Sequence, residues 1–114
     1  MQGLHLILDC RATKHLSDVE EVTAWVVKTI HACGMRLLGL TALQLETHLD
    51  SGPGVSVNAT LAESHLCVHT WPELGKVNAD FFSCRPFDTD AVYASFMAWF
   101  GVTQTMRRHV IERC

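Results

Sequence analysis

The clearest hydrophobic pattern in the chain lies in residues 65–69, which read His-Leu-Cys-Val-His. Apolar and polar side chains alternate there with a period of two, which is typical of a β-strand with one buried face. Because residues two apart on a strand share a face, the two imidazoles and the thiol point away from the apolar pair. We expect the apolar face to pack against a helix, and Pro72 to end the strand because proline cannot donate to a β-ladder.

Other segments are predicted to be strands because they are apolar or alternate in polarity between turn residues. Two further segments have apolar residues at helical spacing and are predicted to be helices. The first is preceded by a capping pattern over Ser17–Glu20, and the second by a cap at Asp88 or Thr89. Gly34 and Gly101 are expected to end these helices. The predicted strands cover residues 3–9, 35–47, 55–61, 77–84 and 105–112, the helices cover 18–33 and 91–100, and a loop covers 49–54.

This order of elements predicts an α+β fold, a two-layer α/β sandwich in which an antiparallel sheet carries two helices on one face. Trp25 lies near the apolar stripe of the first helix, and we expect it in the core. Only 18% of the residues are charged, fewer than the ~25% that is usual in globular domains. With so little polar cover, the sheet is expected to bury its open face against a second copy, giving a homodimer.

Length and charge narrow the classes of function. The 114 residues predict a single domain, residues 1–114. A net charge of −3 without a basic patch disfavours a nucleic-acid partner, and no apolar stretch is long enough for a transmembrane helix. The N-terminus does not read as an export signal. Together with the lack of an apparent export signal, the odd number of cysteines (five) predicts reduced thiols and a cytoplasmic protein.

Reactive side chains are concentrated in residues 62–73, which read Ala-Glu-Ser-His-Leu-Cys-Val-His-Thr-Trp-Pro-Glu. One interpretation is a zinc site, in which His65, Cys67 and His69 offer three ligands on one strand face and Cys84 offers a fourth. The paired short spacings of structural zinc sites are absent, so our prediction is that the protein holds no metal. Any one of these residues alone is also compatible with an ordinary strand.

Two further interpretations use Ser64 as a nucleophile. In the first it is a hydrolytic serine with His69 as base and Asp80 behind it, although the Gly-x-Ser-x-Gly turn of many serine hydrolases is absent. In the second the hydroxyl attacks the carbonyl of Glu63 and converts the peptide bond to an ester. β-Elimination of that ester cuts the chain and leaves dehydroalanine, which hydrolyses to a pyruvoyl group. That chemistry requires a strained turn, an oxyanion donor and a base.

The same residues resemble a known family. Residues 63–66 (Glu-Ser-His-Leu) followed by 69–73 (His-Thr-Trp-Pro-Glu) are similar to the short prokaryotic S-adenosylmethionine decarboxylases, which are pyruvoyl enzymes. The resemblance covers nearly the whole chain, with further matches at residues 3–6, 54–56, 80 and 84. It implies an α/β sandwich, a homodimer of cleaved protomers and an active site where two protomers meet.

For self-processing, the resemblance implies cleavage between Glu63 and Ser64, which gives a β chain of residues 1–63 and an α chain of residues 64–114. Ser64 becomes the covalent pyruvoyl cofactor that forms a Schiff base with the substrate. His69 is implied as the processing base, and Ser56 as the hydroxyl that assists it.

For turnover, the resemblance implies that Cys84 is the proton donor to the substrate carbon after carbon dioxide leaves. Glu73 is implied to bind the ribose hydroxyls, and Trp71 to face the adenine ring. The predicted activity is therefore the decarboxylation of S-adenosylmethionine in polyamine biosynthesis.

Two positions depart from the family pattern. No aromatic residue lies between His48 and Ser56, where a phenylalanine usually sandwiches the purine, and Val57 stands where glycine is usual. Asp50 on the same loop could instead bind an ammonium or guanidinium group. An ornithine or arginine decarboxylase on the same scaffold is therefore the alternative, and an unprocessed, inactive paralogue acting as a partner subunit is a third possibility.

Overall fold

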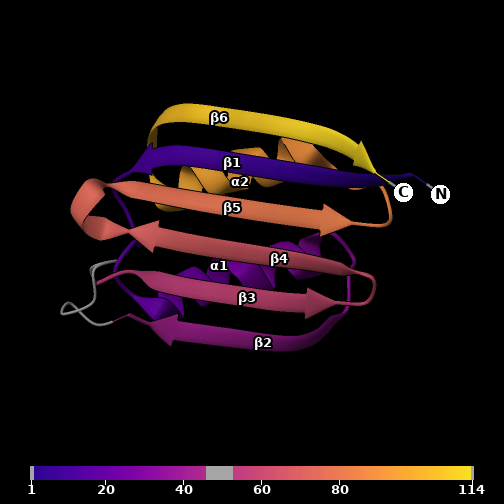
Figure 1. Cartoon of the computed structure of the whole chain (residues 1–114), viewed down its shortest axis with the longest axis horizontal. Helices are drawn as coiled ribbons and strands as arrows, with labels where there is room; N and C mark the ends of the chain where they lie inside the picture. Colours follow the sequence, from indigo (N-terminus) through magenta and orange to yellow (C-terminus); the bar gives the residue numbers. More distant parts are fainter. Residues whose placement is uncertain (1, 46–52, 114) are drawn as a thin grey trace.

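The protein is described by a computed structural model that places residues 2–45 and 53–113. Figure 1 shows one sheet with both helices on the same side of it. The strands follow the order β2-β3-β4-β5-β1-β6, and all neighbours run antiparallel. The predicted fold class is thereby confirmed. The elements are β1 (Gly3–Ala12), α1 (Val19–Ala32), β2 (Leu37–Gln44), β3 (Val55–Leu61), β4 (Ser64–Trp71), the 3₁₀ turn η1 (Pro72–Leu74), β5 (Lys76–Ser83), α2 (Thr89–Phe100) and β6 (Val102–Arg113).

Several boundaries differ from the predicted ones for local reasons. The residue that caps α1 is Asp18 rather than Ser17, because its side chain accepts the Glu20 N–H at 2.8 Å. The second strand begins at Leu37 rather than at residue 35, because the Met35 N–H still bonds to a carbonyl of α1. The first and last strands are longer than predicted, because β1 and β6 pair along most of their length.

The core lies between the helices and one face of the sheet. Leu66 and Val68 of β4 are fully buried, as their alternation predicts. Trp25 of α1 is also buried, and its indole N–H donates to Ser95 Oγ of α2 at 3.0 Å, which joins the two helices. Packing on this face fixes the direction of every side chain in β4, because a one-residue slip would exchange its two faces.

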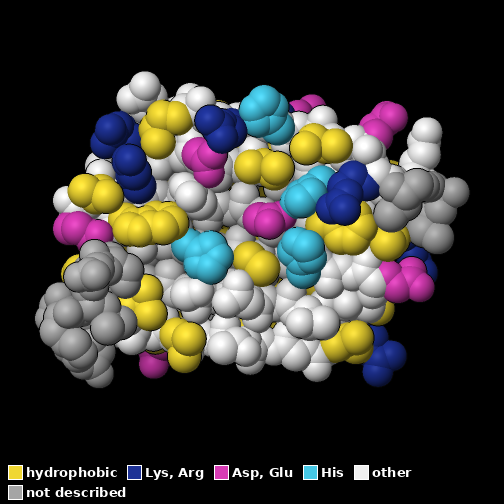
Figure 2. All heavy atoms as spheres, in the orientation of Figure 1, with side chains coloured by type: hydrophobic (Ala, Val, Ile, Leu, Met, Phe, Trp, Pro, Cys, Tyr) yellow, Lys and Arg dark blue, Asp and Glu magenta, His cyan; other side chains and the backbone are white. Residues whose placement is uncertain are grey.

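The other face of the sheet carries no helix, and Figure 2 shows it with histidine side chains around an acidic side chain near its centre. His65, Cys67 and His69 are only partly buried here. An open face on which side chains are half-buried and polar is available to a second protein layer. None of the helices in residues 2–45 and 53–113 is long and apolar enough to cross a bilayer.

Candidate active site

The hairpin between β3 and β4 places a strained residue beside Ser64. Leu61 pairs with Ser64, so Ala62 and Glu63 form a two-residue loop. Glu63 has φ +61°, one of two non-glycine residues with positive φ in the described chain. Two-residue hairpins favour turns with positive φ at both loop residues or at the first one, whereas here only the second has it. The left-handed conformation costs a residue with a Cβ about 1–2 kcal/mol, and this strain adjoins the bond between residues 63 and 64.

Ser64 and Cys84 share one cavity of about 420 Å³ at the end of the sheet. Both residues line it because Ser64 of β4 pairs with Ser83 of β5, so Cys84, the next residue along the chain, lies at the same end of the sheet. Gly3 of β1 permits this approach, since a Cβ at that position would lie 2.5 Å from the Ser83 carbonyl oxygen and 3.1 Å from Cys84 Cα. The cavity is lined by residues 33–36, 62–64 and 83–86.

A second cluster lies farther along β4, where His69 pairs with Ser56 of β3. Ser56 Oγ and His69 Nδ1 are 3.0 Å apart, and the Asn58 amide donates to the same hydroxyl at 3.3 Å. Burial lowers the pKa of His69, and the negative charge of Asp80 partly opposes that shift. The imidazole is therefore neutral near pH 7 and able to accept a proton. The predicted pair of Ser56 and His69 is thus in contact.

His69 and Ser64 do not meet within one chain. They are five residues apart on the same strand, which at about 3.3 Å per residue separates them by about 16 Å. An odd spacing also puts them on opposite faces of the sheet. The hydrolase interpretation, which required His69 beside Ser64 in one chain, is therefore wrong for the isolated protomer.

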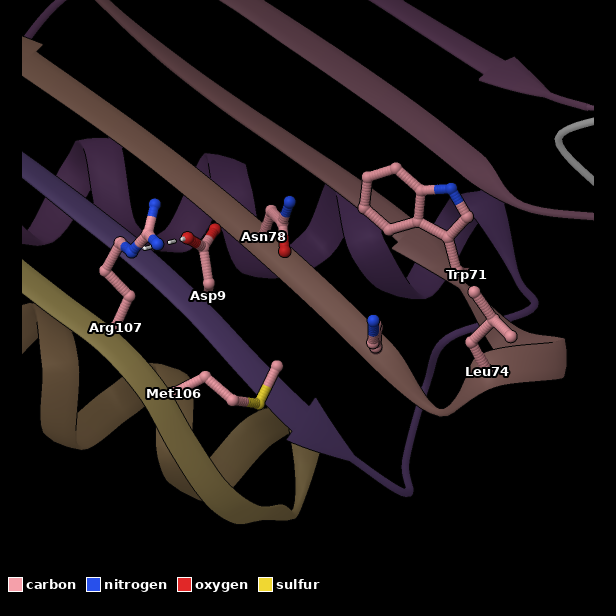
Figure 3. A pocket seen from close by; sticks show the side chains of 7 residues that line it. Asp9, Trp71, Leu74, Asn78, Met106 and Arg107 are labelled. Carbon is pink, nitrogen blue, oxygen red and sulfur yellow. Dashed lines mark ion pairs between the residues drawn. The ribbon is translucent and has the colours of Figure 1, made fainter.

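Trp71 lies at the far end of β4 and forms one wall of a cavity of about 430 Å³ on the open face. Figure 3 shows its indole on one side and the ion pair between Asp9 and Arg107 on the other, with a distance of 3.8 Å from Arg107 Nε to Asp9 Oδ2. Glu73 follows in the turn η1 and is exposed. Sequence reasoning missed Asp9, Asn78 and Arg107. Asp9 and Asn78 occupy strand positions that alternate with core residues, whereas Arg107 lies on β6, in which no residue is buried. Asp50, the predicted ligand for an amino-acid substrate, lies outside the described residues.

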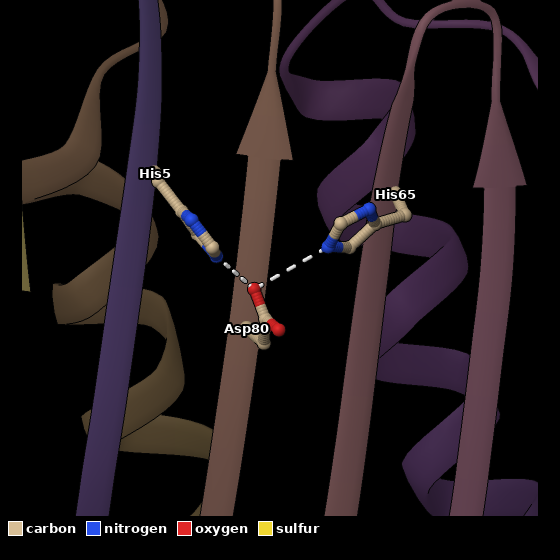
Figure 4. Close-up of side chains that lie close together, drawn as sticks. All are labelled: His5, His65 and Asp80. Atoms are coloured by element: carbon tan, nitrogen blue, oxygen red, sulfur yellow. Dashed lines mark hydrogen bonds and ion pairs between the residues drawn. The ribbon is translucent and has the colours of Figure 1, made fainter. Parts of the chain in front are cut away.

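Three side chains from neighbouring strands converge at the centre of the open face. As Figure 4 shows, His5 of β1 and His65 of β4 both point at Asp80 of β5. Asp80 Oδ1 bonds to His5 Nε2, and His65 Nε2 lies 3.4 Å from the same oxygen. Sequence reasoning missed this cluster, because His5 lies 75 residues from Asp80 and only the sheet order makes β1 and β5 neighbours.

This cluster is the one group in the described chain whose ligand atoms could hold a metal ion, since they lie within 4.8 Å of one another. However, Arg113 Nη1 lies 3.1 Å from His5 Nδ1. An arginine can only donate, so the proton of a neutral His5 sits on Nε2 and is donated to Asp80. Metal-bound histidines instead donate from their second nitrogen. The hydrogen bonding therefore favours a charge-balanced network over a metal site. In the alternative zinc set, His65 faces Asp80 whereas His69 faces Ser56.

Comparison with known proteins gives one consistent result. Residues 4–113 match the model of the S-adenosylmethionine decarboxylase family. The chain is 39% identical over 84 residues to the S-adenosylmethionine decarboxylase proenzyme of Methanococcus vannielii, covering 72% of this chain and 65% of that protein. It is 32% identical over 121 residues to the proenzyme of Methanococcus aeolicus, covering 96% of this chain and 97% of that one.

The fold has a counterpart among solved structures. The crystal structure of the adenosylmethionine decarboxylase from Aquifex aeolicus VF5 superposes with a TM-score of 0.78 at 22% sequence identity. The superposition covers 97% of this chain and 89% of that one. At this identity the likeness concerns the fold, and it agrees with the sandwich described above.

Proposed function

The chain belongs to the S-adenosylmethionine decarboxylase family, and from this membership we propose that it cuts itself between Glu63 and Ser64 and then decarboxylates S-adenosylmethionine. One observation carries the proposal: Ser64 and Cys84 line the same cavity directly beside a residue held at φ +61°. Strained backbone that persists next to a nucleophile is typical of functional sites. The proenzyme names of the relatives are consistent with a chain that is processed.

The cavity residues fit a pyruvoyl group formed at residue 64. In the proposed processing, the Ser64 hydroxyl attacks the Glu63 carbonyl and replaces the peptide bond with an ester, which relaxes the turn. Removal of the Ser64 α-proton then expels the Glu63 carboxylate and cuts the chain. A pyruvoyl group would supply an electron-poor carbonyl that condenses with the substrate amine and withdraws electrons from its α-carbon. Cys84 lines the same cavity and in this proposal delivers a proton to that carbon.

His69 can serve Ser64 only from a second copy, given the separation of about 16 Å within the chain. The open sheet face offers the surface for that copy. Two such faces can pack about a two-fold axis that lies between the sheets and runs perpendicular to the strands. In that arrangement β4 of one protomer runs opposite to β4 of its partner. The end with Ser56, His69 and Trp71 in one protomer then lies near the hairpin at residues 62–63 of its partner. Because the Ser64 side chain is on the helix-covered face, the partner's His69 would reach the bond between residues 63 and 64 at this hairpin, where the sheet ends. We therefore propose a homodimer in which each active site uses both protomers, with Trp71 facing the adenine and Glu73 binding the ribose.

Co-expression of two inactive variants tests this arrangement. Ser64→Ala lacks the nucleophile and His69→Ala lacks the base, so each alone should stay as one chain. In a mixed dimer, His69 of the Ser64→Ala chain can act on Ser64 of the His69→Ala chain. We expect intact mass spectrometry to show cleavage of the His69→Ala chain only in the mixture. The control partner is Ser64→Ala/His69→Ala, which should give no rescue. Absence of cleavage in the mixture would contradict the shared site.

Substrate choice is tested directly by release of carbon dioxide from carboxyl-labelled S-adenosylmethionine, ornithine and arginine. The proposal predicts that S-adenosylmethionine gives by far the highest kcat/KM. Faster release from either amino acid would assign the chain to the alternative activity. Ser64→Ala is the matched control, because it keeps the fold and the cavity but cannot form the cofactor.

A further inference from the structure

Two arginines face the cavity that holds Ser64. Arg36 comes from the connection between α1 and β2, and Arg85 follows β5. Both are exposed, and neither guanidinium forms an ion pair with any residue in the described ranges. Arg108, by contrast, is paired with Asp90. Unpaired cations at a cavity that also holds a reacting bond are available to a negative charge formed there.

Backbone hydrogen bonds hold both arginines close to that bond. The Arg36 carbonyl accepts the Ala62 N–H at 3.4 Å, one residue before Glu63. The Arg85 N–H donates to Ser83 Oγ at 3.0 Å, and Ser83 is the strand partner of Ser64. The two side chains therefore start on either side of the hairpin, one near Glu63 and one near Ser64, and their length lets both reach the junction.

Self-cleavage creates a negative charge at this junction. A base takes the α-proton of Ser64, and the electron pair of that C–H bond forms the double bond between Cα and Cβ. The bond between Cβ and the ester oxygen breaks, and its electron pair leaves on the carboxylate of Glu63. Water then hydrolyses the dehydroalanine and releases ammonia. Glu63 thus becomes a chain end with two carboxylates, where the uncut chain has one.

We propose that Arg36 and Arg85 stabilise the carboxylate that leaves from Glu63 and then hold it as the new end of the β chain, an inference that rests on the proposed self-cleavage. Two guanidinium groups match the two carboxylates of the cut Glu63 in charge. Guanidinium also matches a carboxylate in geometry, since it can donate two parallel hydrogen bonds. The stabilisation is absent from the uncut peptide and grows as the Cβ–O bond breaks, so it accelerates elimination rather than ester formation.

The test follows cleavage in freshly synthesised protein by intact mass. We expect Arg36→Gln/Arg85→Gln to eliminate about tenfold more slowly than the wild type, as suits charge-assisted hydrogen bonds at a screened site. The slow step should leave the ester to accumulate. Hydroxylamine should cleave that ester into residues 1–63 ending in a hydroxamate and residues 64–114 beginning with an unmodified serine amine, two products that differ in mass from those of elimination. Arg36→Lys/Arg85→Lys keeps the charges and should recover most of the rate. Arg108→Gln, which removes an arginine elsewhere, should behave as wild type.

The dependence of the cleavage rate on salt provides a second test, because a purely structural role of the two arginines would not make the rate depend on ionic strength. Raising the ionic strength should slow cleavage of the wild type and have little effect on the double glutamine variant. If the wild type cleaves and the double variant cleaves at the same rate, the inference is overturned while the proposed function stands. Normal cleavage with a raised KM for S-adenosylmethionine would also overturn it, because the arginines would then bind the substrate carboxylate. A wild type that stays whole would remove the proposed function itself.

Discussion

Replacing Glu63 with glycine should slow self-cleavage. The left-handed backbone at this residue is strained because of its Cβ, and glycine, which has no Cβ, adopts the same conformation without that strain. The conformation at φ +61° costs a residue with a Cβ about 1–2 kcal/mol. If the strain is released as the peptide becomes an ester, its removal raises the barrier by the same amount. At 1.36 kcal/mol per factor of ten, cleavage should become about 5- to 30-fold slower.

Two controls separate strain from the loss of the carboxylate. Glu63→Ala removes the carboxylate but keeps a Cβ, and so should cleave much faster than Glu63→Gly. His15→Gly removes the same kind of strain at the other described non-glycine residue with positive φ, far from the hairpin, and should leave the cleavage rate unchanged. The assay is the first-order conversion of newly made chain to two fragments, followed by intact mass. A Glu63→Gly variant that cleaves as fast as the wild type would refute the strain argument.

Three further outcomes follow from the same site. Gly3→Ala should displace the backbone at Cys84 and lower turnover at least several-fold in the carbon dioxide assay. Gly39→Ala is the control and should keep normal activity, because nothing lies within 4 Å of its added Cβ. Equal losses of activity in the two variants would contradict the packing argument. Burial lowers the pKa of His69 below its usual 6.5. The cleavage rate should therefore be constant from pH 7 upward and fall only below about pH 6.5, where the base becomes protonated. A fall in the rate that begins above pH 7 would exclude His69 as the base. Asp80→Asn should lower the pKa of His69 further in an NMR titration of its imidazole, since the raising charge is gone, and an upward shift would refute the assigned cause.

The order of the elements, and which side chains of β4 are buried, could be predicted from the sequence because both depend on the local pattern of apolar and polar residues. Alternation at residues 65–69 gave the correct buried face, and Gly101 gave the C-terminal end of the second helix. Asp88, one of the two candidate caps, does cap this helix, but the helix begins at Thr89 rather than at residue 91. The start of the second strand could not be predicted in this way. Met35 lies beyond the end of α1, but its N–H bonds to the Ile30 carbonyl, and no pattern in the sequence indicates that hydrogen bond.

The candidate site depends on pairings between distant segments, and these lie beyond a sequence pattern. Asp80 meets His5 only because β1 inserts between β5 and β6. Residues close in sequence were also misleading, because Ser64 and His69 belong to one motif yet lie on opposite faces of the sheet. The roles of Ser56, His69, Cys84, Trp71 and Glu73 remain predictions, and the proposed dimer is the arrangement that reconciles them with the geometry.

The central claim is tested most directly by the intact mass of freshly made wild-type protein after it has been incubated with a carbonyl reagent such as a hydrazine. The account predicts two fragments that separate at the bond between residues 63 and 64, with the reagent attached only to the fragment that begins at residue 64. One full-length species without the label, identical in behaviour to Ser64→Ala, would contradict the account.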